Sequence, residues 1–500
     1  MMNRLSLPAW TGKKGAVIAL LAGAIMPLAF APFHWYPLAV LSLLLLFVSW
    51  QQTTPKQAFW RGCLFGLGMF GVGVSWVFVA IHEFGDASVP LAVFLTGLFV
   101  GFLSLYTGAL GALIRRVSSQ QFSISDLLLL LPFAWLVLEW FKGWFLTGFP
   151  WLDIGVSQID GPLAGWIPVI GVLGVTWLVA LTAALLLVAW GKRHWWPALL
   201  VLVIWLGGWG IQQVDWTQAT DNSLKATLIQ GNIPQEIKWD PEQLMRTLAL
   251  YEVRTQEHWD SDLVVWPENA VTAFYHQLKD FYFQPLAEQA RQHNTDILLG
   301  LPFMDLATEN YYNSMMLLGN GEAFYHKQHL VPFGDYVPFE TLRGLIAFFD
   351  LPMSSFSKGR ADQPLIEAAG EKVAISICYE DTFTSQVRSG LPEATMLVNA
   401  TNNAWYGDSF APHQHLQISR SRALESGRPM LRVTTNGISA FIDFKGQLER
   451  QTAQFAEATL THEVQPRTGY TPYIFWGRWP LGILTVLGFG LWWHFKRKAT

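Results

Sequence analysis

Three residues with reactive side chains lie at or near the ends of short apolar runs. Glu268 follows the run 263–266, and Cys378 ends the run 373–378. Lys327 comes shortly before a Pro-Phe-Gly loop. A thiol attacks as its thiolate, a carboxylate removes protons as a general base, and an ammonium group stabilises an oxyanion. Any one of the three alone is more typical of packing or of a solvated turn, but together they indicate covalent catalysis.

The polar part of the chain alternates strand-like runs with helix-like segments. Buried strands are predicted at 226–229, 263–266, 297–301, 314–318, 373–378 and 395–398. Helices are predicted at 241–258, 284–293 and 413–426. This alternation is typical of an α/β domain in which helices cover sheets. Because open α/β sheets place their sites at strand ends, we expect Glu268, Lys327 and Cys378 to converge.

The remainder of the chain is too apolar for a soluble protein. Charged residues make up 14% of the 500 residues and hydrophobic residues 51%, whereas a soluble domain carries roughly a quarter charged residues. A helix of about 20 apolar residues crosses a bilayer. We therefore expect seven N-terminal spans, at 15–33, 36–50, 62–81, 89–114, 127–146, 163–190 and 195–211, and a last span at 479–495. The composition excludes a disordered chain, a collagen-like fibre and a fully soluble enzyme.

The first span also has the layout of a cleaved signal peptide. It begins with basic residues, continues as an apolar run and ends near Ala29-Phe30-Ala31. A second apolar span follows at once, which favours a retained helix over a cleaved peptide.

Basic residues predict the orientation of the spans. Cytoplasmic loops are enriched in Lys and Arg, and these residues cluster at ends that fall on one side of the membrane: Arg4, Lys13, Lys14, Lys56, Arg61, Arg115, Arg116, Lys192, Arg193, Lys496, Arg497 and Lys498. The loop after the third span carries Glu83 and Asp86 and no basic residue. We expect a seven-span transmembrane domain at 1–211, an extracytoplasmic catalytic domain at 212–478, and a last helix with a cytoplasmic tail at 479–500.

Two pairs of glycines lie four residues apart within predicted spans. They are Gly62 with Gly66 and Gly97 with Gly101. Small residues at this spacing permit close contact between membrane helices, although ordinary packing of a helical bundle also explains them.

Three other classes of protein are less favoured. The counts of 33 Lys and Arg against 37 Asp and Glu give no basic excess for binding nucleic acid. His326 with His329, or His413 with His415, offers imidazole ligands, but neither pair has a Cys or Glu at the usual zinc spacing, so we expect no metal. A transporter would place ionisable residues in the middle of its spans, whereas the only span with a charged side chain is 127–146.

The chain resembles the nitrilase superfamily, whose glutamate, lysine and cysteine follow the order seen here. It resembles more closely, over essentially its whole length, the bacterial apolipoprotein N-acyltransferases. The segments that carry this resemblance are Phe-Leu-Thr-Gly-Phe-Pro-Trp at 145–151, Gln-Gly-Asn-Ile-Pro-Gln at 230–235, Leu-Val-Pro-Phe-Gly at 330–334 and Cys-Tyr-Glu at 378–380. The resemblance implies a helical membrane bundle with a nitrilase-like α-β-β-α sandwich.

The resemblance also implies roles for individual residues. By position, Glu268 is the base, Lys327 the lysine and Cys378 the nucleophile. Supporting positions fall on Tyr379, Glu380 and Asp335, and substrate-binding positions on Trp239, Trp405 and Arg343. The family commonly has Glu where this chain has Asp335, whose side chain has the same charge and a shorter reach.

The activity implied by the resemblance is a two-step acyl transfer. Cys378 takes an acyl chain from a phospholipid, in particular from sn-1 of phosphatidylethanolamine, as a thioester. The acyl chain then passes to the α-amino group of the N-terminal diacylglyceryl-cysteine of an apolipoprotein.

The two cysteines are not expected to form a disulfide. Cys63 lies in an apolar span and is a poor disulfide partner for Cys378, so we expect Cys378 to be a free thiol.

The same resemblance predicts where and how the protein works. We expect a monomer in the bacterial inner membrane, with its catalytic domain in the periplasm and no cofactor. The alternative is a membrane-anchored carbon–nitrogen hydrolase that uses the same three residues on an amide. The triad does not separate the two, but a soluble amide would not require eight membrane spans.

Overall fold

The computed structural model describes residues 7–8, 10–192, 194–337 and 355–499. The chain divides into two compact units. The helical unit consists of residues 1–78, 88–215 and 475–500, and the sandwich unit of residues 79–87 and 216–474. The short segment 79–87 therefore belongs with the sandwich unit, although helices of the other unit precede and follow it in the sequence.

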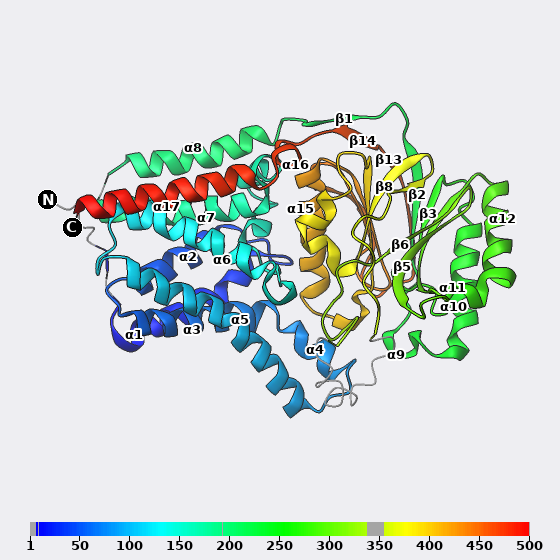
Figure 1. Ribbon diagram of the computed structural model, residues 1–500, viewed down its shortest axis with the longest axis horizontal. Helices are drawn as coiled ribbons and strands as arrows, with labels where there is room; N and C mark the ends of the chain where they lie inside the picture. Colours follow the sequence, from blue (N-terminus) through cyan, green and yellow to red (C-terminus); the bar gives the residue numbers. More distant parts are fainter. Residues whose placement is uncertain (1–6, 9, 193, 338–354, 500) are drawn as a thin grey trace. The chain divides into compact units, whose positions relative to one another are not determined.

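Each apolar segment that the sequence predicts as a span contains a helix (Figure 1). The helices of these segments are α1 (Gly12–Ile25) with a 3-10 turn (Met26–Ala29), α2 (Pro37–Trp50), α3 (Pro55–Gly73), α4 (Trp76–His82), α5 (Val89–Val117), a π-turn (Asp126–Leu130) leading into α6 (Leu131–Lys142), α7 (Ile167–Lys192), α8 (Trp196–Ile211) and α17 (Trp479–Ala499). Short 3-10 turns at Phe145–Thr147, Ile154–Gln158 and Pro162–Trp166 connect α6 to α7.

Three helical segments in the described part of the chain are long and apolar enough to cross a membrane. They are Gly12–Ala29, Val89–Val117 and Pro162–Lys192. Helices α3 and α4 would make a fourth if they form one span, because together they pass the same test but are bent by 59°. Helices α2 and α8 are apolar and shorter. The count of seven N-terminal spans stays a prediction.

Glycines allow α3 and α5 to pack closely. A Cβ atom on Gly62 would lie 2.3 Å from the Thr107 carbonyl oxygen, and one on Gly66 would lie 2.6 Å from the Ser104 Cα atom. The Thr107 hydroxyl donates a 2.8 Å hydrogen bond to the Gly62 carbonyl oxygen across this contact. By contrast, Cβ atoms on Gly97 and Gly101 would meet no described atom within 4 Å. The same four-residue spacing therefore has a packing role in α3 and none at these two positions of α5.

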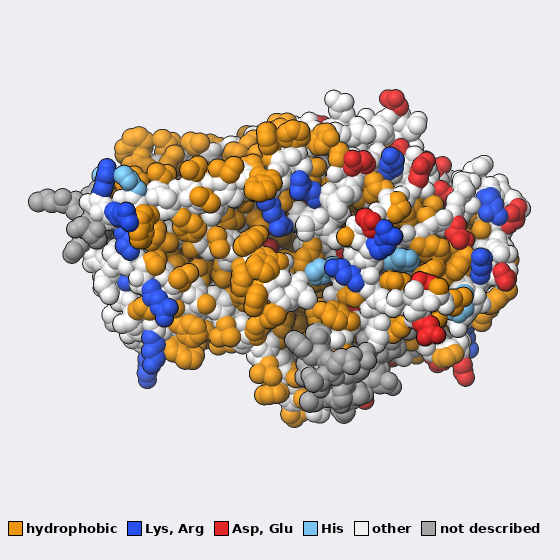
Figure 2. Space-filling model, in the orientation of Figure 1, with side chains coloured by type: hydrophobic (Ala, Val, Ile, Leu, Met, Phe, Trp, Pro, Cys, Tyr) orange, Lys and Arg blue, Asp and Glu red, His pale blue; other side chains and the backbone are white. Residues whose placement is uncertain are grey.

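The surface of the helical unit is rich in apolar side chains (Figure 2). Large hydrophobic residues are exposed along α5, α8 and α17: Val93, Phe94, Leu98, Leu199, Leu202, Val203, Leu206, Trp209, Ile483, Val486 and Leu487. Contiguous apolar surface on this scale is costly in water. It is the surface that helices in contact with lipid require.

The sandwich unit contains two six-stranded sheets. The first has the order β13-β2-β3-β4-β5-β6, with strands Ala458–Val464, Leu224–Gln230, Leu263–Val265, Asp296–Met304, Tyr311–Leu318 and Glu322–His326. The second has the order β12-β11-β10-β9-β8-β7, with strands Leu448–Gln451, Ala440–Ile442, Met430–Thr434, Met396–Thr401, Glu371–Ile377 and Ile366–Ala368. In each sheet the three central strands are parallel: β2, β3 and β4 in the first, and β8, β9 and β10 in the second. Strands β1 (Thr217–Ala219) and β14 (Arg467–Gly469) form a small separate pair.

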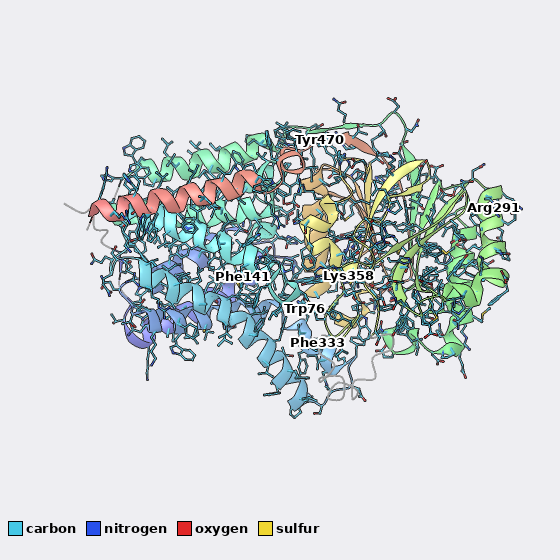
Figure 3. The ribbon with its side chains drawn as sticks, in the orientation of Figure 1. Trp76, Phe141, Arg291, Phe333, Lys358 and Tyr470 are labelled. Atoms are coloured by element: carbon cyan, nitrogen blue, oxygen red, sulfur yellow. The ribbon has the colours of Figure 1, made fainter. Side chains whose placement is uncertain are left out.

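Helices cover the outer faces of both sheets. Helices α9 (Gln235–Lys238), α10 (Pro241–Gln256), α11 (Tyr275–Leu278) and α12 (Gln284–Gln292) belong to the first sheet, and α14 (Thr384–Arg388) and α15 (Ala411–Ser426) to the second. Figure 1 shows α10 and α12 on one side of the paired sheets and α15 on the other. On α12, Leu286, Ala287 and Ala290 are buried, while Arg291 points outward (Figure 3). This helical spacing of buried residues explains why the segment packs on the sheet.

The predicted fold class is confirmed. The six predicted strands and three predicted helices all occur, with bounds that differ by a few residues. The layers of the sandwich unit are those of an α-β-β-α sandwich, and the helical unit is rich in apolar helices. The apolar runs were sufficient for this prediction because strands buried between layers read as continuous hydrophobic sequence.

The close α3–α5 contact predicts a difference between two chemically identical substitutions. Gly62→Ala places a methyl group against the backbone of α5, and we expect it to lower the free energy of unfolding by about 1–3 kcal/mol. Gly97→Ala enters open space within a helix, so we expect it to be neutral or stabilising. Thermal unfolding of both variants in detergent measures the difference. Equal unfolding temperatures would contradict the close contact.

Candidate active site

The structure brings Glu268, Lys327 and Cys378 together within the sandwich unit. Glu268 follows β3, Lys327 directly follows β6, and Cys378 directly follows β8. The Lys327 ammonium nitrogen lies 3.4 Å from Glu268 Oε1, and both charges act on the Cys378 thiol. All three side chains are buried. Strand ends of both sheets therefore supply the site.

Three donors surround the Glu268 carboxylate. Its Oε1 accepts a 2.7 Å hydrogen bond from the Asn313 amide in addition to the Lys327 contact. Its Oε2 accepts a 2.8 Å bond from the backbone N–H of Asn402. Asn313 lies in β5, while Lys327 directly follows β6 and Asn402 directly follows β9, so both sheets hold the carboxylate in one orientation.

Lys327 is held between two carboxylates. Its ammonium lies 2.7 Å from Asp335 Oδ2 and 3.4 Å from Glu268 Oε1. Burial lowers the pKa of Lys327, but the charges of Asp335 and Glu268 raise it more, so the net pKa lies well above the ordinary value. Asp335 Oδ2 also accepts a 2.7 Å bond from the Val331 N–H. The shorter side chain of Asp335 thus reaches the lysine because the loop turns back on itself.

Cys378 has an unusual backbone and a neutral thiol. Its φ of +53° lies in the left-handed region, which is sparsely populated by residues other than glycine and clusters at functional sites. Burial and the nearby Glu268 carboxylate raise the pKa of Cys378 to about 12, although the Lys327 charge acts in the opposite direction. The thiol therefore requires a neighbouring base to become a thiolate.

Glu380 connects two loops of the site. Its Oε1 accepts hydrogen bonds from the backbone N–H groups of Gln328 (2.6 Å) and His329 (3.0 Å). Its Oε2 accepts bonds from the Ile377 N–H (2.7 Å) and the Tyr325 hydroxyl (3.0 Å). Burial raises the pKa of Glu380 to about 7, against the effect of the backbone donors. Glu380 thereby fixes the segment after Lys327 relative to the segment that carries Cys378.

The other residues that the sequence predicts for the site lie on the segments next to it, except for one outside the described residues. The Tyr379 ring is tilted against the His329 ring at 6.1 Å and packs edge-on against Phe383 at 5.1 Å. Trp405 belongs to the 3-10 turn Asn403–Tyr406 that follows Asn402, and its ring meets Phe84 edge-on at 6.3 Å. Trp239 directly follows α9. Arg343 lies outside the described residues.

Lys238 was not predicted from the sequence as a site residue. Its ammonium donates hydrogen bonds to the Glu268 carbonyl oxygen (3.1 Å) and to the Thr435 hydroxyl (3.3 Å). Burial lowers the pKa of Lys238 to about 8, although the charges of Glu268 and Cys378 raise it. Asn313 and Asn402 were also missed, because an amide or a backbone N–H in a strand carries no distinctive sequence signal.

The histidines of the metal alternative have other partners. His326 Nδ1 lies 2.7 Å from the Ser314 hydroxyl, and His415 Nε2 lies 2.8 Å from Asp381 Oδ1. Within the part of the chain that the structure describes, no group of three His, Cys, Asp or Glu side chains could hold a metal ion.

Two family profiles match separate parts of the chain. The family profile described as "Apolipoprotein N-acyltransferase N-terminal domain" matches residues 22–185, and that described as "Carbon-nitrogen hydrolase" matches residues 225–473. Among solved structures, a CN-hydrolase superfamily protein of Xanthomonas campestris is similar over 49% of this chain and 91% of its own, with 18% identity and a TM-score of 0.38.

Similarity to curated relatives extends over nearly the whole chain. The apolipoprotein N-acyltransferase of Methylococcus capsulatus is 45% identical over 477 residues, covering 93% of each chain. That of Azotobacter vinelandii is 44% identical over 100% of this chain and 98% of its own. That of Vibrio parahaemolyticus is 41% identical over 97% of this chain and 98% of its own.

The paired sheets and the profile match over residues 225–473 define a carbon–nitrogen hydrolase domain. The apolar helices that precede it are those of a membrane protein. The chain belongs to the apolipoprotein N-acyltransferase family and is an acyltransferase.

The buried Lys238 ammonium predicts a pH dependence of stability. Its pKa of about 8 in the folded protein lies below the ordinary value of 10.5. Between these two values the unfolded chain binds more protons than the folded chain, so the contribution of Lys238 to the free energy of unfolding rises with pH. We expect wild type to gain about 3 kcal/mol relative to Lys238→Met across this window.

Thermal unfolding in detergent from pH 7.5 to 10.5 measures this gain. Lys225→Met is the matched control, because Lys225 lies at the surface, where it pairs with Asp260. The control should follow wild type across the window. If the Lys238→Met curve also runs parallel to that of wild type, Lys238 is not a desolvated ammonium group.

Proposed function

We propose that this enzyme moves an acyl chain from sn-1 of phosphatidylethanolamine, through a thioester on Cys378, to the α-amino group of the N-terminal diacylglyceryl-cysteine of apolipoproteins. The observation that supports the thioester step is the buried Glu268–Lys327 pair, with a 3.4 Å contact, whose charges act on a thiol with a pKa raised to about 12. The nature of the donor and of the acceptor follows from membership of the apolipoprotein N-acyltransferase family. A base, a cation and a protonated nucleophile are the groups that acyl transfer through a thioester uses.

In the first step Glu268 accepts the thiol proton while Cys378 Sγ attacks the carbonyl carbon of the phospholipid ester. The negative charge that develops on the carbonyl oxygen is stabilised by the Lys327 ammonium. The tetrahedral intermediate then collapses to the thioester. The glycerol oxygen leaves with the proton returned by Glu268, and the other product is a lysophospholipid.

In the second step the amine of the apolipoprotein attacks the thioester carbonyl carbon. Glu268 accepts the proton that the amine nitrogen loses, and Lys327 again stabilises the oxyanion. The C–S bond breaks, the sulfur recovers the proton from Glu268, and an amide remains on the lipoprotein. Since Glu268 is held by Asn313 and Asn402, one carboxylate serves both proton transfers without rearrangement.

The helical unit supports a lipid donor. Its exposed apolar side chains on α5, α8 and α17 suit contact with acyl chains. We propose that the protein is a monomer in the bacterial inner membrane, with seven spans in residues 1–211 and an eighth in residues 479–500. Residues 212–478 would then work in the periplasm without a cofactor. Trp239 directly follows Lys238, and Trp405 lies in the turn after Asn402; both Lys238 and Asn402 contact Glu268. We propose that these two tryptophans contact the lipid substrates.

The proposal predicts a covalent acyl-enzyme. Purified protein incubated with phosphatidylethanolamine and no acceptor should gain the mass of one acyl chain, as measured by intact mass spectrometry. Hydroxylamine should remove it, because a thioester is cleaved by this nucleophile, and a diacylated lipopeptide should discharge it to a triacylated product. Cys378→Ala should show no mass increase.

Cys63→Ala is the matched control, since Cys63 lies in α3 of the helical unit, and it should acylate like wild type. A folded wild-type protein without an adduct would contradict the acyl-enzyme. Release of ammonia from small amides by the same sample would instead favour the amide hydrolase.

Asp335 provides a second test of the proposed mechanism. Asp335→Asn keeps the shape of the side chain but removes the charge that lies 2.7 Å from the Lys327 ammonium. We expect the single-turnover acylation rate to fall by about 10-fold or more, because the lysine would no longer be held toward the oxyanion. Asp362→Asn, which breaks an exposed pair with Arg360, should leave the rate unchanged. A wild-type rate in Asp335→Asn would exclude this role of Asp335.

A further inference from the structure

A cluster of buried polar side chains contacts the backbone carbonyl of Cys378 in the sandwich unit. We call it the backing cluster. Its members come from the segment after β8, from β9, from β10, from α15 and from the turn after β9, and each is at most 1% exposed: Asp381, Asn399, Arg432, His415, Ser419 and Asn403. Burial of so many polar groups is costly unless each is directed toward a partner.

Arg432 orients two amide side chains. Its Nη1 donates to Asn399 Oδ1 (2.5 Å), and its Nη2 donates to Asn403 Oδ1 (3.1 Å). Because the guanidinium group only donates, both amide oxygens must face it. The two amide nitrogens are therefore directed away from Arg432.

The Asn399 amide nitrogen acts directly on the nucleophile's backbone. It donates to the Cys378 carbonyl oxygen at 3.1 Å, and it also reaches the Ser376 hydroxyl at 3.1 Å. Asn399 thus links Arg432 to the peptide group that joins Cys378 to Tyr379.

The Asn403 amide acts on the same carbonyl through His415. Its Nδ2 lies 3.3 Å from His415 Nδ1, which must accept because an amide nitrogen only donates. His415 Nε2 therefore carries a proton, which faces Asp381 Oδ1 at 2.8 Å and the Cys378 carbonyl oxygen at 3.2 Å. Burial and the Arg432 charge lower the pKa of His415, although Asp381 raises it, which agrees with a neutral ring.

Asp381 balances the charge of the backing cluster. Its Oδ2 accepts a 2.5 Å bond from Ser419 and lies 3.6 Å from Arg432 Nη1. Ser419 in turn lies 2.7 Å from Arg432 Nη1. The cluster therefore contains one cation and one anion around a neutral imidazole, and its hydrogen-bond directions are fixed.

Two series of hydrogen bonds from Arg432, one through Asn399 and one through Asn403 and His415, end at the Cys378 carbonyl oxygen. A trans peptide is planar, with its C=O and N–H on opposite sides, so fixing the Cys378 carbonyl also fixes the Tyr379 N–H. That N–H points away from the backing cluster. The φ of +53° at Cys378 is the local conformation that this arrangement must maintain.

We propose that Asn399 and His415, oriented by Arg432, are positioning residues that aim the Tyr379 N–H at the oxyanion of the acyl intermediate. The inference rests on the proposed function, since it concerns the same tetrahedral intermediate.

Two reactions of Cys378 separate this role from general support of the fold. Acylation by phosphatidylethanolamine forms an oxyanion, whereas alkylation by iodoacetamide displaces iodide and forms none. Both reactions need the thiol to lose its proton to Glu268. A change that affects only the oxyanion should therefore slow acylation and leave alkylation unchanged.

The test compares single-turnover acylation and alkylation of Cys378 in Asn399→Ala. We expect the acylation rate to fall about 100-fold and the alkylation rate to stay within about twofold of wild type, since alkylation needs no oxyanion donor. Arg428→Lys is the control for stability, because Arg428 is fully buried in the same unit but bonds to the carbonyl oxygens of Ala394, Pro392 and Gly469. It should acylate at the wild-type rate even if its unfolding temperature falls.

A second pair of variants covers the case in which Asn399→Ala does not fold. His415→Gln keeps a donor near the position of Nε2 and should retain most of the acylation rate, whereas His415→Leu should lose it with alkylation unchanged. Equal losses in both reactions, or wild-type acylation in the Asn399 and His415→Leu variants, would overturn the inference. A wild-type protein that alkylates but never acylates would overturn the proposed function together with it.

Discussion

The proposed catalytic centre depends on keeping a charged lysine inside the protein. Lys327 is 1% exposed, and an unpaired ammonium in such a place would cost several kcal/mol or lose its proton. Asp335 at 2.7 Å and Glu268 at 3.4 Å supply the compensating charge. Glu268 thus has two uses in the proposed mechanism: its carboxylate compensates the charge of Lys327, and it serves as the base for the Cys378 thiol.

This charge network explains why two sheets are needed. Glu268, Asn313 and Lys327 follow or lie in strands of the first sheet, whereas Cys378 and Asn402 follow strands of the second. Glu380 joins the two sets through backbone donors on both sides. Neither sheet alone supplies the Cys378 thiol, the Glu268 carboxylate and the Lys327 ammonium, so both sheets are needed to assemble the proposed site.

Much of the fold was predictable because apolar periodicity is local. Runs such as 263–266 and 373–378 are short, largely apolar and rich in Val and Ile, and these local features favour buried strands over helices. The bend between α3 and α4 was not predictable, because the segment 62–81 is uniformly apolar. The glycine spacing was equally ambiguous: Gly62 faces a neighbouring helix and Gly97 does not, and only the packing of α3 on α5 distinguishes them.

The sequence by itself determined the division into an apolar helical part and an α/β part, and it indicated the three residues proposed for catalysis, because residue types and their order are properties of the chain. Only the tertiary structure decided what surrounds those residues. Three contacts show this: Lys238 with the Glu268 carbonyl oxygen, Asp335 with Lys327, and Asn399 and His415 with the Cys378 carbonyl oxygen. They join residues up to 37 positions apart or depend on how a loop turns. Hydrogen-bond directions and desolvation act through space, so no local pattern encodes them.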